Sequence, residues 1–338
     1  MPSDMRLPIL DLSRLDQGAD EAEAFRTELR EATHEYGFFY LTGHGVPQEL
    51  LDDAISTARD FFDLPLDDKL SIENVKSPHF RGYTRVGGEL TLGKTDWREQ
   101  IDIGPEREAI PKEPETPDYW VLEGPNQWPD ALPHLREVVS QWQDQLNAVS
   151  LKLMRAWAES LGAEPTFFDD AFAERPSTLI KIVRYPGKDD PVSQQGVGAH
   201  KDYGVLTLLY VEDGKAGLQV EKDGEWIDAP PVNGAFVVNI GELLEVATGG
   251  YLKATTHRVI SPKAGDDRIS VPFFYAPSLD RMIPTLTLPP ELQARSRGVT
   301  ADAAGQPLFD TYGKNALKGR LRAHPDVAAI HHPELTGR

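Results

Sequence analysis

The chain places an imidazole and a carboxylate two positions apart at the start of an apolar run, in the stretch GVGAHKDYGVLTLLY (residues 196–210). Side chains two residues apart in an extended strand point to the same face, so His200 and Asp202 would point to one place. A further imidazole, His257, lies in the strand-like stretch YLKATTHRVIS. Two imidazoles and one carboxylate form the facial triad, which leaves positions open on an Fe(II) ion. The pattern predicts an iron site, although a surface pair or a helix cap would explain His200 and Asp202 alone.

Arg268 and Ser270 form a second pair with this spacing, in the stretch DDRISVPFFYAP. A guanidinium and a hydroxyl on one strand face can hold a carboxylate through charge-assisted hydrogen bonds. The residues that follow are apolar, and an arginine buried among them is costly unless an anion meets it. The pair therefore predicts a carboxylate-binding site on an interior face.

Composition limits the remaining possibilities. The 338 residues are 40% apolar and 26% charged, which is typical of a globular protein of one large or two ordinary domains. A formal net charge of -19 argues against nucleic acid and anionic membranes as partners. Because there is no cysteine, any metal must be held by His, Asp or Glu. The N-terminus resembles no signal peptide and no apolar run is long enough to span a membrane, so we expect a cytoplasmic protein, by default a monomer.

The elements that would position these residues divide the chain into two parts. We expect residues 1–128 to form a mixed α/β region packed on the core, and residues 129–338 to form one compact unit. Apolar periodicity and helix-forming residues predict helices over 21–36, 47–62, 130–161 and 308–322. The longest of them would be the backbone helix of the scaffold.

Short β-branched and aromatic stretches follow residue 178, separated by turn signals such as EDGK, KDGE and AGDD. Strands of this length and spacing are typical of a sandwich or jelly roll. A jelly roll can bring strands that are distant in sequence together at one open end. The predicted fold class is α+β, mainly β: a double-stranded β-helix (jelly roll) with flanking helices. The predicted strands are TLIKIVRY, GVLTLLYV, GLQV, AFVVNI, HRVIS and RISVPFFYA.

Together these motifs resemble the isopenicillin N synthase-like family of Fe(II)- and 2-oxoglutarate-dependent oxygenases. The resemblance covers nearly the whole chain, through PILDLS, GFFYLTGHGV, RGYTRVGGE, KIVRYP, GAHKDYGVLTLL, FVVNIGELLEVATGGYLKATTHRV and RISVPFFYAP. It implies an enzyme that binds Fe(II) and uses 2-oxoglutarate and O2 as cosubstrates. Such an enzyme oxidises a small-molecule substrate, most often by hydroxylation, and releases succinate and CO2.

The resemblance also implies roles for single residues. The metal ligands would be His200, Asp202 and His257; the 2-oxoglutarate contacts would be Arg268, Ser270 and Tyr185; Phe274 would line the substrate pocket. Plant-type relatives often read Asn-Tyr-Tyr-Pro where this chain reads Val183-Arg184-Tyr185-Pro186, so an asparagine that can help hold 2-oxoglutarate is absent. Lys181 could supply a compensating charge, or it could point outward from its strand.

The substrate is less well indicated. Glu89 and Thr91 resemble a pair in bacterial ethylene-forming enzymes that contacts L-arginine, and Tyr203 and Arg322 are similar to two further contacts there. Glu89 is equally well explained as an ordinary loop carboxylate. Besides the 2-oxoglutarate-dependent oxygenase, three alternatives stay open at this point: an Fe(II) oxidase of the same family that uses no 2-oxoglutarate, an ethylene-forming or arginine-oxidising enzyme, and a non-catalytic jelly-roll binding module.

Overall fold

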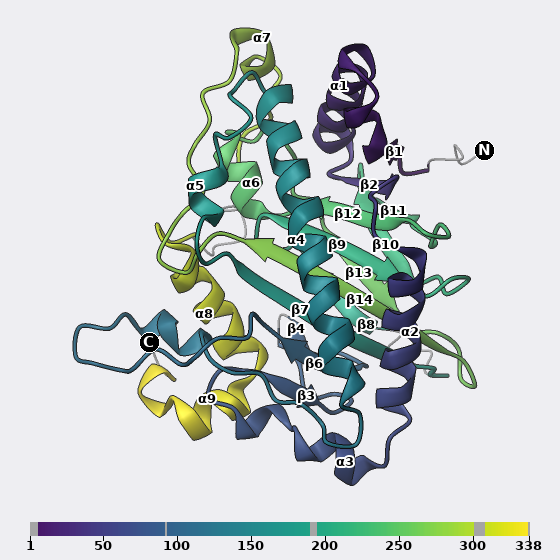
Figure 1. Ribbon diagram of the computed structural model, residues 1–338, viewed down its shortest axis with the longest axis vertical. Coiled ribbons are helices and arrows are strands. Elements are labelled where there is room, and N and C mark those ends of the chain that lie inside the picture. Colours follow the sequence, from purple (N-terminus) through teal and green to yellow (C-terminus); the bar gives the residue numbers. More distant parts are fainter. Residues whose placement is uncertain (1–5, 92, 190–194, 301–307, 337–338) are drawn as a thin grey trace.

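The computed structural model describes residues 6–91, 93–189, 195–300 and 308–336 (Figure 1). The first part of the chain alternates helices with short strands. Its helices are α1 (Ala19–Glu35), α2 (Gln48–Phe62) and α3 (Leu66–Ser71). Its strands are β1 (Ile9–Asp11), β2 (Phe38–Thr42), β3 (Gly82–Thr84), β4 (Leu90–Thr91), β5 (Lys94–Thr95) and β6 (Glu99–Ile103).

The second part begins with a long helix and continues mostly as strands. Its helices are α4 (His134–Ser160), α5 (Asp169–Phe172), α6 (Glu242–Ala247), α7 (Pro290–Gln293), α8 (Tyr312–Ala323) and α9 (Pro325–His331). Its strands are β7 (Ser177–Pro186), β8 (Gln195–His200), β9 (Leu206–Val211), β10 (Leu218–Lys222), β11 (Glu225–Asp228), β12 (Phe236–Ile240), β13 (His257–Ile260) and β14 (Asp267–Ala276). Within the described ranges, none of the helices has the length and apolar character needed to cross a membrane.

The strands form two main sheets. The larger sheet has the order β1-β2-β12-β9-β14-β7-β6-β3, the smaller one has the order β11-β10-β13-β8, and β4 pairs with β5 as a separate hairpin. Pairing is antiparallel except between β1 and β2. Strands from the first part of the chain therefore lie at both ends of the larger sheet, with strands of the second part between them.

Alternation along the strands gives each face of the larger sheet its own apolar layer. On β12, Phe236 and Val238 join the larger core cluster, which also holds apolar residues of α1, α2 and α4, whereas Val237 belongs to a smaller cluster. That smaller cluster also contains Val220 and Val259 of the small sheet. In Figure 1, α4 crosses the larger sheet and packs on β9 and β14, with α1 and α2 against it. The expected jelly-roll fold with a backbone helix is confirmed.

The sequence does not predict β8 as a separate strand that ends at His200, because QGVGAH has two glycines and few β-forming residues. Close packing favours glycine at position 196, where a Cβ would lie 2.9 Å from the Tyr185 ring. The strand ends at His200, and Asp202 lies in the segment that follows it. The expectation that one extended strand presents both residues is therefore wrong, and a change of chain direction brings the carboxylate beside the imidazole.

Candidate metal centre

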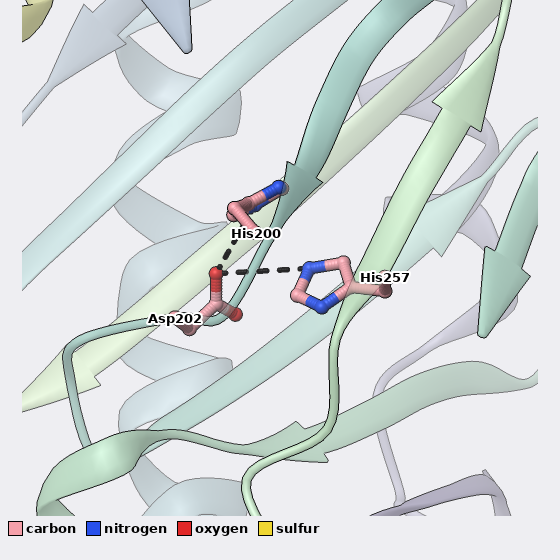
Figure 2. A group of neighbouring side chains, drawn as sticks. All are labelled: His200, Asp202 and His257. Atoms are coloured by element: carbon pink, nitrogen blue, oxygen red, sulfur yellow. Dashed lines mark ion pairs between the residues drawn. The ribbon is translucent and has the colours of Figure 1, made fainter. Parts of the chain in front are cut away.

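Three side chains from two chain segments converge between the sheets (Figure 2). His200 ends β8, His257 begins β13, and the two are register partners in the small sheet. Asp202 Oδ1 lies 3.6 Å from His200 Nε2 and 3.7 Å from His257 Nε2. One ligand atom from each residue lies within 4.8 Å of the other two. This geometry suits a single ion bound by two imidazole nitrogens and one carboxylate oxygen.

Backbone carbonyls orient both imidazoles. His200 Nδ1 lies 2.8 Å from the carbonyl oxygen of Gly198, and His257 Nδ1 lies 3.1 Å from that of Thr255. A carbonyl only accepts, so each Nδ1 carries a proton and each Nε2 points toward Asp202. Burial, together with the neighbouring His200, lowers the pKa of His257 to about 4. The His257 ring is therefore neutral at physiological pH, as a metal ligand must be.

The carboxylate is oriented by two side chains of the larger sheet. Asp202 Oδ2 accepts hydrogen bonds from Thr207 Oγ1 at 2.5 Å and from Asn239 Nδ2 at 2.8 Å, which leaves Oδ1 toward the imidazoles. Burial alone would raise the pKa of Asp202, but His257, His200 and the Asn239 hydrogen bond hold it well below its usual range. Asp202 is thus a buried, ionised ligand.

The same cavity contains a buried cation, Arg268, that forms no ion pair with any described residue. Arg268 is 1% exposed and donates from Nη1 to Ser270 Oγ at 3.2 Å, while its Nε has no partner among the described residues. Burial lowers the pKa of Arg268, and the ring of Tyr185 lies 5.0 Å from its guanidinium carbon. Buried guanidiniums need a counter-ion, so these residues fit a carboxylate ligand. Phe274 lines the cavity as well.

Lys181 is turned inward rather than outward. Its ammonium lies 2.6 Å from Glu89 and 3.6 Å from Asp102, and the side chain is buried. It does not line the cavity that contains the three candidate ligands and Arg268. Lys181 therefore balances buried carboxylates beside that cavity.

The residues expected at the substrate pocket are brought together only in part. Glu89 is buried, and Thr91 of β4 donates to Asp96 at 2.7 Å. Tyr203 packs on α8, where a Cβ on Gly319 would lie 3.2 Å from its ring. Arg322 is exposed on α8. The assignment of Arg322 to this pocket stays a prediction. Two residues along a helix point in nearly opposite directions, so another arginine of α8 takes the inward position.

That inward arginine is Arg320, which is buried and ion-paired with Asp102. Sequence reasoning also missed Thr207, Asn239 and Arg98. A single asparagine within the buried strand FVVNI indicates a polar partner in the interior, and this signal could have identified Asn239. Thr207 and Arg98 carry no comparable signal.

Comparisons with known proteins agree with this geometry. Residues 7–131 match the family model of the non-haem dioxygenase N-terminal region, and residues 177–277 match that of the 2OG-Fe(II) oxygenase superfamily. A 2-oxoglutarate-dependent dioxygenase of Dothideomycetidae sp. is 38% identical, over 95% of this chain and 90% of its own. A homoarginine-6-hydroxylase of Arabidopsis thaliana is 34% identical, over 86% of this chain and 91% of its own.

A solved structure shares the whole fold. A full-length Neurospora crassa protein in complex with alpha-KG superposes with a TM-score of 0.75 and 25% identity, covering 95% of this chain and 98% of that chain. Together the two family models cover strands of both sheets, and the second model includes His200, Asp202 and His257. The chain therefore belongs to the 2OG-Fe(II) oxygenase superfamily and is a non-haem, 2-oxoglutarate-dependent oxygenase.

Proposed function

We propose that His200, Asp202 and His257 bind Fe(II), and that Arg268 and Ser270, assisted by Tyr185, hold the distal carboxylate of 2-oxoglutarate. A triad of preoriented ligands shares one cavity with a buried guanidinium that has no counter-ion among the described residues, and this observation carries the proposal. The reaction assigned to this site is oxidation of a small molecule, most often hydroxylation.

When iron and 2-oxoglutarate are bound, the family's chemistry couples decarboxylation to succinate and CO2 with oxidation of a substrate C–H bond. The chain's own residues bind and orient. Thr207 and Asn239 fix the Asp202 carboxylate, and Arg268 sets the direction of the dicarboxylate. Apolar side chains such as Val197 and Leu218 line the remaining wall and exclude water.

Two measurements test this assignment. Anaerobic addition of 2-oxoglutarate to the Fe(II)-loaded protein should produce a weak visible charge-transfer band, and His257→Ala should abolish it. Aerobic turnover should release succinate. An active preparation that releases no succinate would instead be an Fe(II) oxidase that uses no 2-oxoglutarate, and a folded, iron-loaded protein without the band would favour a binding module.

A narrower candidate is a substrate with a guanidino group. The homoarginine-6-hydroxylase relative supports it, and so does the charged cluster beside the cavity, formed by Glu89, Asp102, Arg98, Lys181 and Arg320. Each carboxylate of this cluster already has a cationic partner, so a guanidinium would have to replace one of them.

A succinate-release screen separates this candidate from the general assignment. Homoarginine and arginine should stimulate release, whereas norleucine, which has a similar chain length and no guanidino group, should not. Equal stimulation by all three compounds would exclude guanidino recognition but leave the oxygenase assignment intact.

We further propose that the protein acts as a monomer in the cytoplasm. A net charge of -19 disfavours self-association through electrostatic repulsion. Light scattering coupled to gel filtration should give a mass near 37.5 kDa. A mass of twice that value would exclude the monomer.

A further inference from the structure

Arg98 lies in the same row of the larger sheet as the residues proposed to hold 2-oxoglutarate. Glu99 pairs with Arg184 of β7, so Arg98 lies next to Tyr185, and Tyr185 pairs with Arg268 of β14. Cross-strand neighbours point their side chains to the same face. Arg98, Tyr185 and Arg268 all line the cavity of the candidate metal centre. Two guanidiniums therefore flank one phenol inside that cavity.

The two guanidiniums approach from opposite sides. The backbone N–H of Trp97 donates to the carbonyl of Gln195 at 3.2 Å, which ties the segment before Arg98 to β8. This strand ends at His200. Arg98 thus lies beside the strand that carries a candidate metal ligand, whereas Arg268 enters from β14.

Only part of the hydrogen-bonding capacity of the Arg98 guanidinium is used. Its Nη2 donates to Glu89 at 2.6 Å and to Asp96 at 3.3 Å. The side chain is 10% exposed, and its buried Nε has no partner among the described residues. An unsatisfied N–H of a buried charged group is costly, so Arg98 retains capacity for a further acceptor.

The described lining of the cavity offers Arg98 the hydroxyl of Tyr185 but no free carboxylate. Among the described residues that line it, Asp202 is the one carboxylate, and both of its oxygens face other groups. Val183, which stands where plant-type relatives often have an asparagine, is fully buried and has no polar atom to offer. The chain therefore lacks that amide but supplies a second guanidinium close to the same place.

We propose that Arg98 is a second cosubstrate-binding cation, which donates to the metal-proximal carboxylate of 2-oxoglutarate while Arg268 holds the distal one. The inference rests on the proposed function, because it requires that 2-oxoglutarate occupies this cavity. A dicarboxylate would then be held at both ends by guanidiniums, with Tyr185 between them. Glu89 and Asp96 would keep Arg98 in position when the cavity holds no cosubstrate.

Anaerobic titration of the Mn(II)-loaded protein by calorimetry tests this division of roles, with 2-oxoglutarate and with 2-oxovalerate, which lacks the distal carboxylate. Arg98→Met should weaken both ligands by about tenfold or more, because a hydrogen bond to a charged group is lost. Arg268→Leu should weaken 2-oxoglutarate only. Arg98→Lys, which keeps a charge beside Glu89 but lacks the Nε–H, should bind both ligands more weakly than the unaltered protein.

Lys69→Met is the matched control. Lys69 is a buried cation paired with Glu99 at 3.0 Å, and Glu99 points to the opposite sheet face from its neighbour Arg98. This variant should lose thermal stability and keep its affinity for both ligands. The inference would be overturned if a folded Arg98→Met variant bound both ligands as tightly as the unaltered protein. It would also be overturned if Lys69→Met lost as much ligand affinity as Arg98→Met. An unaltered protein that binds no 2-oxoglutarate would contradict the proposed function itself.

Discussion

Asp202 owes its orientation to a single hydroxyl and a single amide, so the candidate metal centre depends on residues that never touch the ion. Thr207→Val removes the hydroxyl at nearly constant volume and leaves Oδ2 of Asp202 with Asn239 alone. We expect affinity for Fe(II) or Mn(II) to fall by about 10–100-fold, as is usual when a hydrogen bond that orients a ligand is lost. Anaerobic metal titration measures this change. Thr207→Ser retains the hydroxyl and should bind metal normally; normal binding by Thr207→Val would refute a role for the hydroxyl.

A second residue-scale prediction concerns Glu242, which begins α6 close to the metal centre. Burial, reinforced by the charges of Glu245 and Asp202, raises the pKa of Glu242 to about 7 despite the opposing Lys201. Between the ordinary pKa of a glutamate and pH 7, Glu242 is protonated in the folded state more often than in the unfolded state. The free energy of unfolding therefore falls as pH rises through this window.

Glu242→Gln should therefore raise the melting temperature of the chelator-treated protein at pH 8 and change it little at pH 4.5. Thermal melts across this pH range measure the difference. Glu225→Gln, a change at an exposed carboxylate of β11, is the surface control and should alter the melting temperature little. A Glu242→Gln difference that shrinks toward high pH would contradict the assigned pKa direction.

The sequence was most informative at this scale where chemistry restricts residue choice. His200, Asp202 and His257 could be proposed because few other roles require that set, and Arg268 because its surroundings are apolar. Charge pairing between distant segments could not be predicted. Lys181 and Arg320 are paired through contacts of β7 and α8 with residues far away in sequence, and only tertiary structure defines such contacts.

At the scale of elements, the segment between β8 and β9 must pass very close to the start of α6. A Cβ on Gly241 would lie 2.2 Å from the carbonyl oxygen of Gly204 and 2.8 Å from that of Asp202. Gly241→Ala should displace this segment, cost about 1–3 kcal/mol of unfolding free energy, and weaken metal binding. Denaturant melts and metal titration measure the two effects.

Gly204→Ala is the control within the same segment, because the nearest atom to its Cβ would be the carbonyl oxygen of Tyr275 at 3.9 Å. It should leave both quantities nearly unchanged. Equal effects of the two substitutions would mean that the segment tolerates displacement and that its close packing does not position Asp202.

Elements with strong periodicity were predictable, and elements without it were not. The helix expected over 130–161 is α4, because its apolar residues recur along one face over many turns. The separate strand β8 could not be predicted because its two glycines, of which Gly196 makes room for Tyr185, weaken the strand signal. The difference is physical: α4 is specified by its own amphipathicity, whereas β8 is specified by its neighbours.

At the scale of the whole molecule, the larger sheet joins the two parts of the chain. Strands β2 and β6 of the first part pair with β12 and β7 of the second, so neither part can complete the sheet alone. We expect one cooperative unfolding transition by calorimetry, with equal van't Hoff and calorimetric enthalpies. Two resolved transitions would show that residues 1–128 unfold independently.

Ligand binding should stabilise the whole molecule in two separable steps. Any ligand that binds only the folded state adds about 2.7 kcal/mol when its concentration is 100 times Kd. Mn(II) should therefore raise the melting temperature of the chelator-treated protein by a few degrees, and 2-oxoglutarate should raise it again. Arg268→Leu should keep the Mn(II) step and lose most of the 2-oxoglutarate step, because a charge-assisted pair contributes about 1.5–3 kcal/mol.

Arg258→Leu provides the comparison for that experiment. Arg258 follows His257 on β13, but its guanidinium lies over Trp226 at 4.0 Å and donates to Gln219 at 2.8 Å, outside the cavity. Its loss should leave both stabilisation steps intact. If 2-oxoglutarate stabilised Arg268→Leu as strongly as it stabilises Arg258→Leu, the buried guanidinium would not be the cosubstrate's counter-ion, and the cavity would have to bind the dicarboxylate through other residues.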